Sequence, residues 1–228
     1  MNNRGAGTQG RRGAVLAVAA SCLAASSALA QQLSGAGLAY NVQHRVLFQG
    51  SVHERTGFWF GGEGAVRLGR LRFGVAGLLG KLSGDSSAAN PDADVRATSV
   101  TLHVAAAPSV LLGMELEARR FASDVGTTTW RLIGGNARAG AGLGLPGLEG
   151  TIDVSYFASA SVLGGEARIS PAFRGTVGAS YQSPRGPIIV QLGYRFERFD
   201  FERSGSGPVR KEQFRGVLAG IGLRLGRR

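Results

Sequence analysis

The sequence predicts an all-β fold: a transmembrane, antiparallel up-and-down β-barrel of about ten strands, with eight strands as the alternative. Three observations favour it. After Tyr40, apolar and polar residues alternate with period 2, which places one face of each strand in apolar surroundings. The alternating runs are about 11 to 16 residues long, whereas soluble strands average ~5–6 residues and a tilted membrane strand needs about 9–11. Short and long connections also alternate along the chain.

The first alternating run, residues 40–52, carries Tyr40, Val42 and His44 on its apolar parity and Arg45 on its polar parity. We therefore expect His44 to face outward and Arg45 inward. The cores of the other nine runs lie within residues 58–68, 71–79, 99–104, 110–119, 128–143, 152–162, 173–182, 188–197 and 216–225. Each has an apolar residue at nearly every second position, as a strand with one apolar face requires.

The run 128–143 is the irregular one. Trp130 and Leu132 share one parity, but the apolar residues beyond Gly134-Gly135 follow the other parity. A β-bulge at the two glycines would account for the change, because a bulge inserts one extra residue and reverses the faces that follow.

The connections support a membrane barrel with both termini on the short-turn side, as a periplasmic arrangement requires. The predicted tight turns are Gly69-Arg70, Ala107-Pro108, Pro146-Gly147 and residues 184–186. The predicted long loops are residues 50–57, 83–94, 123–127, 163–170 and 203–208. Several aromatic residues fall near the long-loop ends, where an interfacial girdle would lie: Phe58, Trp59, Phe60, Phe121, Trp130, Phe199, Phe201 and Phe214.

The N-terminus has the features of a cleaved signal peptide, residues 1–30, which leaves residues 31–228 as the barrel domain. Three arginines precede a run of small apolar residues, and Ala28-Leu29-Ala30 forms an A-x-A cleavage site. The segment contains these three arginines and no acidic residue, so its removal would lower the formal net charge from +11 to +8. Cys22, the one cysteine of the chain, would leave with the same segment.

The mature sequence resembles the outer-membrane β-barrel proteins of Gram-negative bacteria over essentially its whole length. Gly220, Leu223 and Leu225 are similar in spacing to the C-terminal assembly signal of that family. The resemblance implies a cell outer membrane location, contact with outer-membrane lipid, and insertion by the outer-membrane assembly machinery. It also implies a monomer.

The polar parity supplies a candidate network inside the barrel. A barrel of eight to ten strands has a narrow interior that side chains largely fill, and buried charges there must pair with one another. The candidate residues are Arg45, Glu63, Arg67, Arg72, His103, Glu115, Glu117, Arg119, Arg131, Asp153, Arg174, Arg195, Glu197 and Arg224.

Three functions remain open at this point. A lumen plugged by salt bridges predicts a structural or surface-interaction role. A narrow porin-like channel is the alternative, and the arginine excess on the inward parity would favour small anionic solutes. The third is a soluble periplasmic barrel that binds a small ligand.

We expect neither an enzyme nor a cofactor protein. The three histidines are scattered and form no metal-binding pattern, and His53-Glu54 and the acids of the outer loops form no catalytic constellation. The glycine-rich strings lack the strand-to-helix context of a phosphate-binding loop. Nucleic acid is not an expected partner, because the arginines alternate along strands instead of forming a patch.

Overall fold

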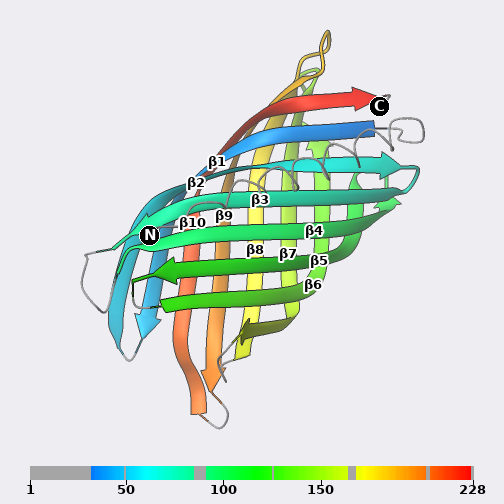
Figure 1. Cartoon of the computed structure of the whole chain (residues 1–228). Helices are drawn as coiled ribbons and strands as arrows, with labels where there is room; N and C mark the ends of the chain where they lie inside the picture. The colour runs from blue at the N-terminus through cyan, green and yellow to red at the C-terminus, as the bar shows by residue number, and fades with distance from the viewer. Residues whose placement is uncertain are drawn as a thin grey trace, which may run out of the picture.

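The computed structural model describes residues 32–48, 50–84, 91–124, 126–163, 168–203 and 206–226. The predicted signal peptide, residues 1–30, lies outside these ranges. The described chain forms a closed β-barrel (Figure 1). Its strands are β1 Gln32–Phe48, β2 Ser51–Leu68, β3 Leu71–Ser83, β4 Ala93–Ala107, β5 Val110–Ser123, β6 Gly126–Gly142, β7 Leu148–Leu163, β8 Arg168–Gln182, β9 Ile188–Arg203 and β10 Ser206–Gly226.

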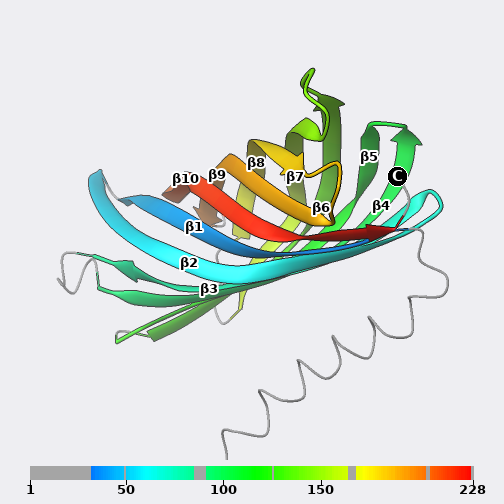
Figure 2. The same cartoon turned by 90° about the horizontal axis from the view of Figure 1, so that it is seen from above.

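Each strand pairs antiparallel with its neighbours in the sequence, and β1 pairs with β10 to close the barrel. The closing seam runs from Gln32 opposite Gly226 to Phe48 opposite Arg210. Figures 1 and 2 show the sheet curling round until the first and last strands lie side by side. The prediction of a ten-stranded antiparallel up-and-down barrel is confirmed. Among the described residues, no helix is both long and apolar enough to cross a membrane.

The strands are longer than the sequence predicted. β2 has 18 residues and already starts at Ser51, so the expected loop 50–57 is wrong. Val46 pairs with His53 and Arg45 with Glu54, so the ladder continues through these polar residues. Gly50 has φ +83°, a left-handed conformation that glycine adopts without strain and that closes a tight hairpin. The predicted loop 123–127 is likewise mostly strand, because β6 starts at Gly126.

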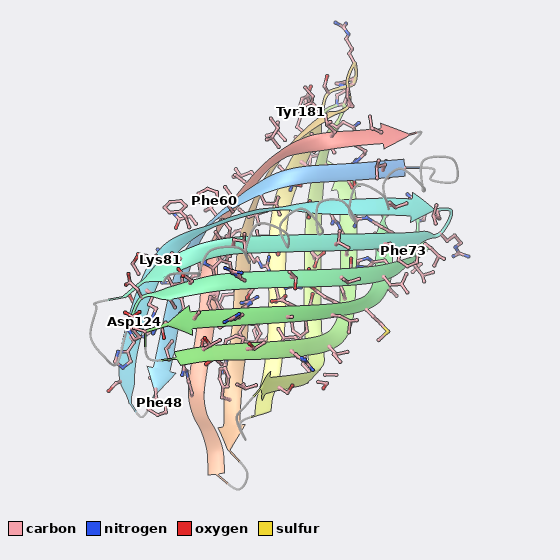
Figure 3. The ribbon with its side chains drawn as sticks, viewed as in Figure 1. Phe48, Phe60, Phe73, Lys81, Asp124 and Tyr181 are labelled. Carbon is pink, nitrogen blue, oxygen red and sulfur yellow. The ribbon has the colours of Figure 1, made fainter. Side chains whose placement is uncertain are left out.

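The outer surface of the barrel has two parts. Around the half near the β2–β3 turn, outward side chains are apolar and exposed, and we call this surface the apolar belt. Figure 3 shows Phe60 and Phe73 outside the barrel wall. The belt includes Phe58, Phe60, Phe73, Val75, Leu79, Val100, Leu102, Leu112, Met114, Leu116, Ile133, Ile152, Val154, Val177, Val190, Leu192, Val217, Ile221 and Leu223.

The rest of the barrel, toward the β1–β2, β3–β4 and β5–β6 connections, is called the distal half here. Its outward side chains are mostly polar, although Leu47 and Val52 near the β1–β2 turn are also exposed. The exposed polar residues are Gln43, Arg45, Glu54, Thr56, Arg96, Thr98, Arg120, Arg131 and Arg215. About 10 residues of tilted strand cross a hydrocarbon layer, so strands of 17 and 18 residues extend well beyond the belt.

The interior changes character at the same level: it is mostly apolar inside the distal half, where His44 and Glu212 form a buried polar pair, and mostly polar inside the belt. This change explains the irregular run in β6, where Trp130, Leu132, Asn136 and Arg138 all follow one inward parity. A bulge is present at this level, but its extra residue lies on β7. Ile133 pairs with Ser159 and Gly134 with Phe157, which leaves Ala158 unpaired. The prediction of a bulge at Gly134-Gly135 placed it on the wrong strand.

Candidate functional site

The centre of the lumen is occupied by Arg119 of β5, whose side chain is completely buried. Its Nε and Nη2 donate to Glu117 Oε1 at 2.9 and 2.6 Å. Its Nη1 donates to Glu197 Oε2 on β9 at 2.6 Å, across the barrel. A buried guanidinium is stable only when charge and hydrogen bonds compensate it, and two carboxylates meet that need here.

Two more arginines complete this cluster, which we call the ionic plug. Arg174 of β8 pairs with Glu115 and donates to Glu117 Oε2 at 2.5 Å. Arg195 of β9 donates to Glu197 Oε1 at 2.6 Å. The plug therefore holds three arginines against three glutamates: Glu115, Glu117, Arg119, Arg174, Arg195 and Glu197. The charges balance inside a space from which water is largely excluded.

Neutral side chains extend the plug toward the belt half. Ser155 Oγ donates to Glu115 Oε2 at 2.6 Å, and Asn136 Nδ2 donates to both Ser155 Oγ and Asp153 Oδ1. His103 Nε2 contacts Asn136 Oδ1. The polar chain thus runs without interruption from β4 to β8.

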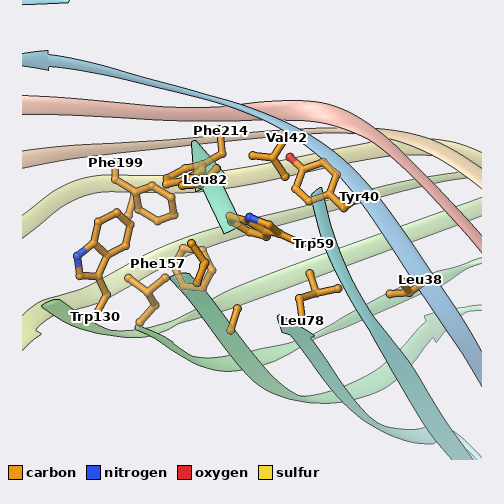
Figure 4. Packing of buried hydrophobic residues seen from close by; sticks show 14 of the residues in the cluster. Leu38, Tyr40, Val42, Trp59, Leu78, Leu82, Trp130, Phe157, Phe199 and Phe214 are labelled. Atoms are coloured by element: carbon orange, nitrogen blue, oxygen red, sulfur yellow. The ribbon is translucent and has the colours of Figure 1, made fainter. Parts of the chain in front are cut away.

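Aromatic rings cover the distal side of the plug. Figure 4 labels Trp59, Trp130, Phe199 and Phe214 in the buried cluster to which these rings belong. The Arg119 Cζ atom lies 5.1 Å from the centroid of Phe214 and 5.3 Å from that of Phe199. It lies 5.6 and 6.0 Å from the rings of Trp59 and Trp130. A cation surrounded by ring faces gains attraction from each of them, and the rings exclude water from its ion pairs. These four rings are named the aromatic cap.

The aromatic cap corrects the predicted interfacial girdle. Trp59, Trp130, Phe199, Phe201 and Phe214 are buried in the lumen, with Phe121 packed against them. Phe58 and Phe60 are more than half exposed on the belt, where a girdle residue would lie. Sequence position placed all of these rings near the distal ends of the strands. Whether a ring belongs to the core or to a girdle depends on whether its side chain points inward or outward.

Most of the predicted network residues line the interior. Glu117, Arg119 and Glu197 are buried in the plug. Arg67 lies at the end of β2, where its Nε donates to Gly69 O at 3.1 Å. The others border the internal cavity described below: Glu63, Arg72, His103, Glu115, Asp153, Arg174, Arg195 and Arg224.

Two predicted network residues were wrong, Arg45 and Arg131, which are exposed on the outer surface of the distal half. Arg45 instead lies 3.7 Å from Glu54 on the outside. The prediction assumed that polar side chains face inward along the whole strand, which fails beyond the apolar belt because the outward side chains there are mostly polar. The prediction that His44 faces outward was wrong for the same reason. His44 is buried, its ring centroid lies 4.1 Å from that of Phe214, and its Nε2 lies 2.8 Å from Glu212 Oε2.

Sequence reasoning missed several interior polar residues, among them Asn136, Arg138, Ser155 and Glu212. Ser155 does lie on the polar parity of its run, but the predicted network contained only charged residues and one histidine. Arg138 alternates with Ala137 and Ala139 and could have been found from that pattern. Nothing local marks Glu212, whose partner His44 is 168 residues away in the sequence.

The belt half of the lumen contains a partly open cavity of about 220 Å³. It lies between the ionic plug and the short-turn end of the barrel. Its wall combines arginines and acids with hydroxyl groups, among them Arg72, Arg138, Glu63, Ser99 and Thr101. A second groove lies at the distal rim. Lys81 Nζ and Asp92 Oδ2 lie 3.1 Å apart there. Hydrogen bonds from Lys81 and from the Gly84 backbone N–H lower the pKa of Asp92.

Within the described ranges, no group of three or more His, Cys, Asp or Glu residues could hold a metal ion. No protein-family model matches the sequence, and comparison with curated proteins likewise gives no match.

Solved structures do match the barrel. The outer membrane protease OmpT from Escherichia coli aligns with a TM-score of 0.57 at 11% identity, covering 85% of this chain and 96% of that one. This match shows that the chain has the fold of bacterial outer-membrane β-barrels. The translocator domain of the autotransporter NalP from Neisseria meningitidis gives a TM-score of 0.47 at 10% identity, covering 93% and 96% of the two chains. Neisserial surface protein A gives 0.41 at 16% identity, covering 85% and 96%.

Proposed function

We propose that this protein is an outer-membrane β-barrel with a sealed lumen, and that its role is structural or one of surface interaction through the distal half. The observation that carries the proposal is the central position of Arg119. It is held by Glu117 and Glu197 from opposite walls and covered by the aromatic cap. A solute would have to break buried ion pairs to pass, and such pairs are strongly destabilised when one partner is left alone.

The apolar belt supports a membrane location. Its outward side chains are large and exposed, among them Met114 and Leu192, at 59 and 60% exposure. Monomeric soluble proteins rarely expose contiguous apolar patches above a few hundred Å². The closed ladder also supports a monomer, because no strand edge remains for a partner chain.

Two measurements test this proposal. The protein should fractionate with the outer membrane and migrate differently on gels before and after heating, and solubility without detergent would contradict the membrane location. In planar bilayers the purified barrel should show no stable conductance. Steady ion current through the wild-type protein would overturn the sealed lumen.

A narrow channel for small anionic solutes is the second candidate, because the cavity holds more arginines than acids on its wall. It requires the plug to open. Neutralising Arg195 and Glu197 together should then change conductance, whereas a sealed barrel loses thermal stability and gains no current. A soluble ligand-binding barrel is the third candidate, and the fractionation experiment distinguishes it.

We further propose anionic outer-membrane lipid as a partner. Arg96 of β4 and Arg120 of β5 are directly opposite each other on the outer surface, and Arg131 of β6 pairs with Ala118, two residues from Arg120. Directly opposed like charges destabilise a sheet unless an anion lies between them. Leu79, in register with Arg96, and Ile133, two residues from Arg131, belong to the belt. This group, the arginine triad, therefore lies at the level of lipid headgroups.

We propose no enzymatic activity. The acids and arginines of the ionic plug are committed to one another, which leaves none of them available as an acid, base or nucleophile. The fold it shares with the protease OmpT is compatible with many functions and by itself assigns none.

A further inference from the structure

The cavity in the belt half contains two arginines that the rest of the lumen leaves without partners. Arg72 of β3 and Arg138 of β6 both line it. In the described part of the chain, neither guanidinium makes a hydrogen bond or an ion pair, whereas Arg174 on the same wall has two carboxylates. Both guanidinium groups are only partly buried, so each is accessible to an anion in the cavity.

The nearby acids do not pair with these arginines. Glu63 accepts a hydrogen bond from Gln191 Nε2 at 3.1 Å, and Asp153 accepts one from Asn136 Nδ2 at 2.8 Å. Neither carboxylate lies within ion-pair distance of an arginine in the described residues. Asp153 is in register with Arg138 on the neighbouring strand and still makes its hydrogen bond to Asn136 instead.

The two guanidinium groups also act on each other. Among the charged neighbours of Arg72, Arg138 has the largest electrostatic effect, ahead of Glu63 and Asp153. Two like charges facing one small cavity repel, and an anion between them would turn the repulsion into attraction. Hydroxyl groups complete the wall, with Ser99 and Thr101 on β4 and Thr151 on β7.

We propose that this cavity is a binding site for a small oxyanion, a phosphate or a carboxylate, held by Arg72 and Arg138. A guanidinium presents parallel N–H donors that match two oxygens of such a group, and charge-assisted pairs of this kind are stronger than neutral hydrogen bonds. The hydroxyls would bind the remaining oxygens. The cavity of about 220 Å³ has room for one small anion and its water, and the ionic plug closes its inner end. The site does not depend on whether the lumen conducts.

The test is calorimetric titration of the folded barrel in an amine-oxide detergent, which carries no phosphate. Inorganic phosphate and acetate are added in separate experiments at low chloride, and sodium chloride is the spherical-anion comparison. Wild-type protein should bind phosphate and acetate more tightly than chloride. Arg72→Gln and Arg138→Gln should each weaken phosphate binding by about tenfold or more, the loss expected for one charge-assisted pair.

Arg215→Gln is the matched control, because it removes the same charge from an exposed position on the outer surface, outside the arginine triad, and should leave binding unchanged. Heat-modifiable migration verifies that each variant is folded, and Arg72→Lys keeps the charge if the glutamine variant does not fold. The lysine variant should bind phosphate more weakly than wild type because it lacks the paired donors. Equal binding by wild type and the Arg72→Gln/Arg138→Gln double variant would overturn the site, and so would equal affinity for chloride and phosphate or no binding by the wild type. None of these results bears on conductance, which tests the sealed lumen separately.

Discussion

Arg119 and Glu197 are 78 residues apart in the sequence and 2.6 Å apart across the lumen, and both side chains are completely buried. They come from β5 and β9, which are four strands apart around the barrel. Their contact therefore connects opposite walls. It exists only after the barrel has closed, so it reports on closure directly.

Removing Arg119 should destabilise the barrel severely. Arg119→Met leaves Glu117 and Glu197 without their shared cation, and breaking a buried pair in this way costs about 3–5 kcal/mol. Urea unfolding in lipid vesicles measures the change. Arg45→Met is the control: Arg45 and Glu54 are 52 and 67% exposed, so their pair should contribute about 0–1 kcal/mol. Equal effects of the two variants would contradict the central role of Arg119.

The aromatic cap should behave as a core and the belt aromatics as a lipid-facing surface. Phe214 is fully buried, so Phe214→Ala should cost about 3–5 kcal/mol of unfolding free energy. Phe60 is 59% exposed, and Phe60→Ala should cost much less in the same vesicles. If both rings belonged to an interfacial girdle, the two substitutions would have similar effects.

Closure of the β1–β10 seam depends on Gly216. A Cβ atom added there would collide with the backbone carbonyl of Asn41 on β1, and backbone cannot move aside as a side chain can. Gly216→Ala should therefore destabilise the folded barrel by about 1–3 kcal/mol, the usual cost of overpacking. Gly175 has nothing within 4 Å of the equivalent position, so Gly175→Ala should fold normally. Thermal melting followed by gel migration compares the two.

The arginine triad should make stability depend on anionic lipid. Wild-type protein should melt at a higher temperature in vesicles containing phosphatidylglycerol than in phosphatidylcholine alone. Arg96→Gln/Arg120→Gln should lose that difference, because each arginine near an anionic surface contributes about 1 kcal/mol. Arg198→Gln removes an outward arginine that Asp200 already pairs at 2.8 Å, so its lipid dependence should stay close to wild type. A lipid effect that survives in the double variant would contradict the assignment.

The sequence alone was sufficient for the strand number, the antiparallel order and the inward direction of Glu115, Glu117 and Arg119. These features follow from period-2 alternation, which is local and requires no knowledge of what lies across the barrel. It also predicted that Arg174, Arg195 and Glu197 point inward, so every residue of the ionic plug was among the predicted network residues.

Only the tertiary structure decided where the alternation changes its meaning. Period 2 states that two faces differ, but which face is inside depends on whether the outer surface at that level is apolar or polar. Arg45, Arg131 and His44 were assigned to the wrong faces for this reason, and the rings of the aromatic cap were assigned to a girdle. The free arginines Arg72 and Arg138 could likewise be found only in space, because a partner's absence depends on what all neighbouring strands supply.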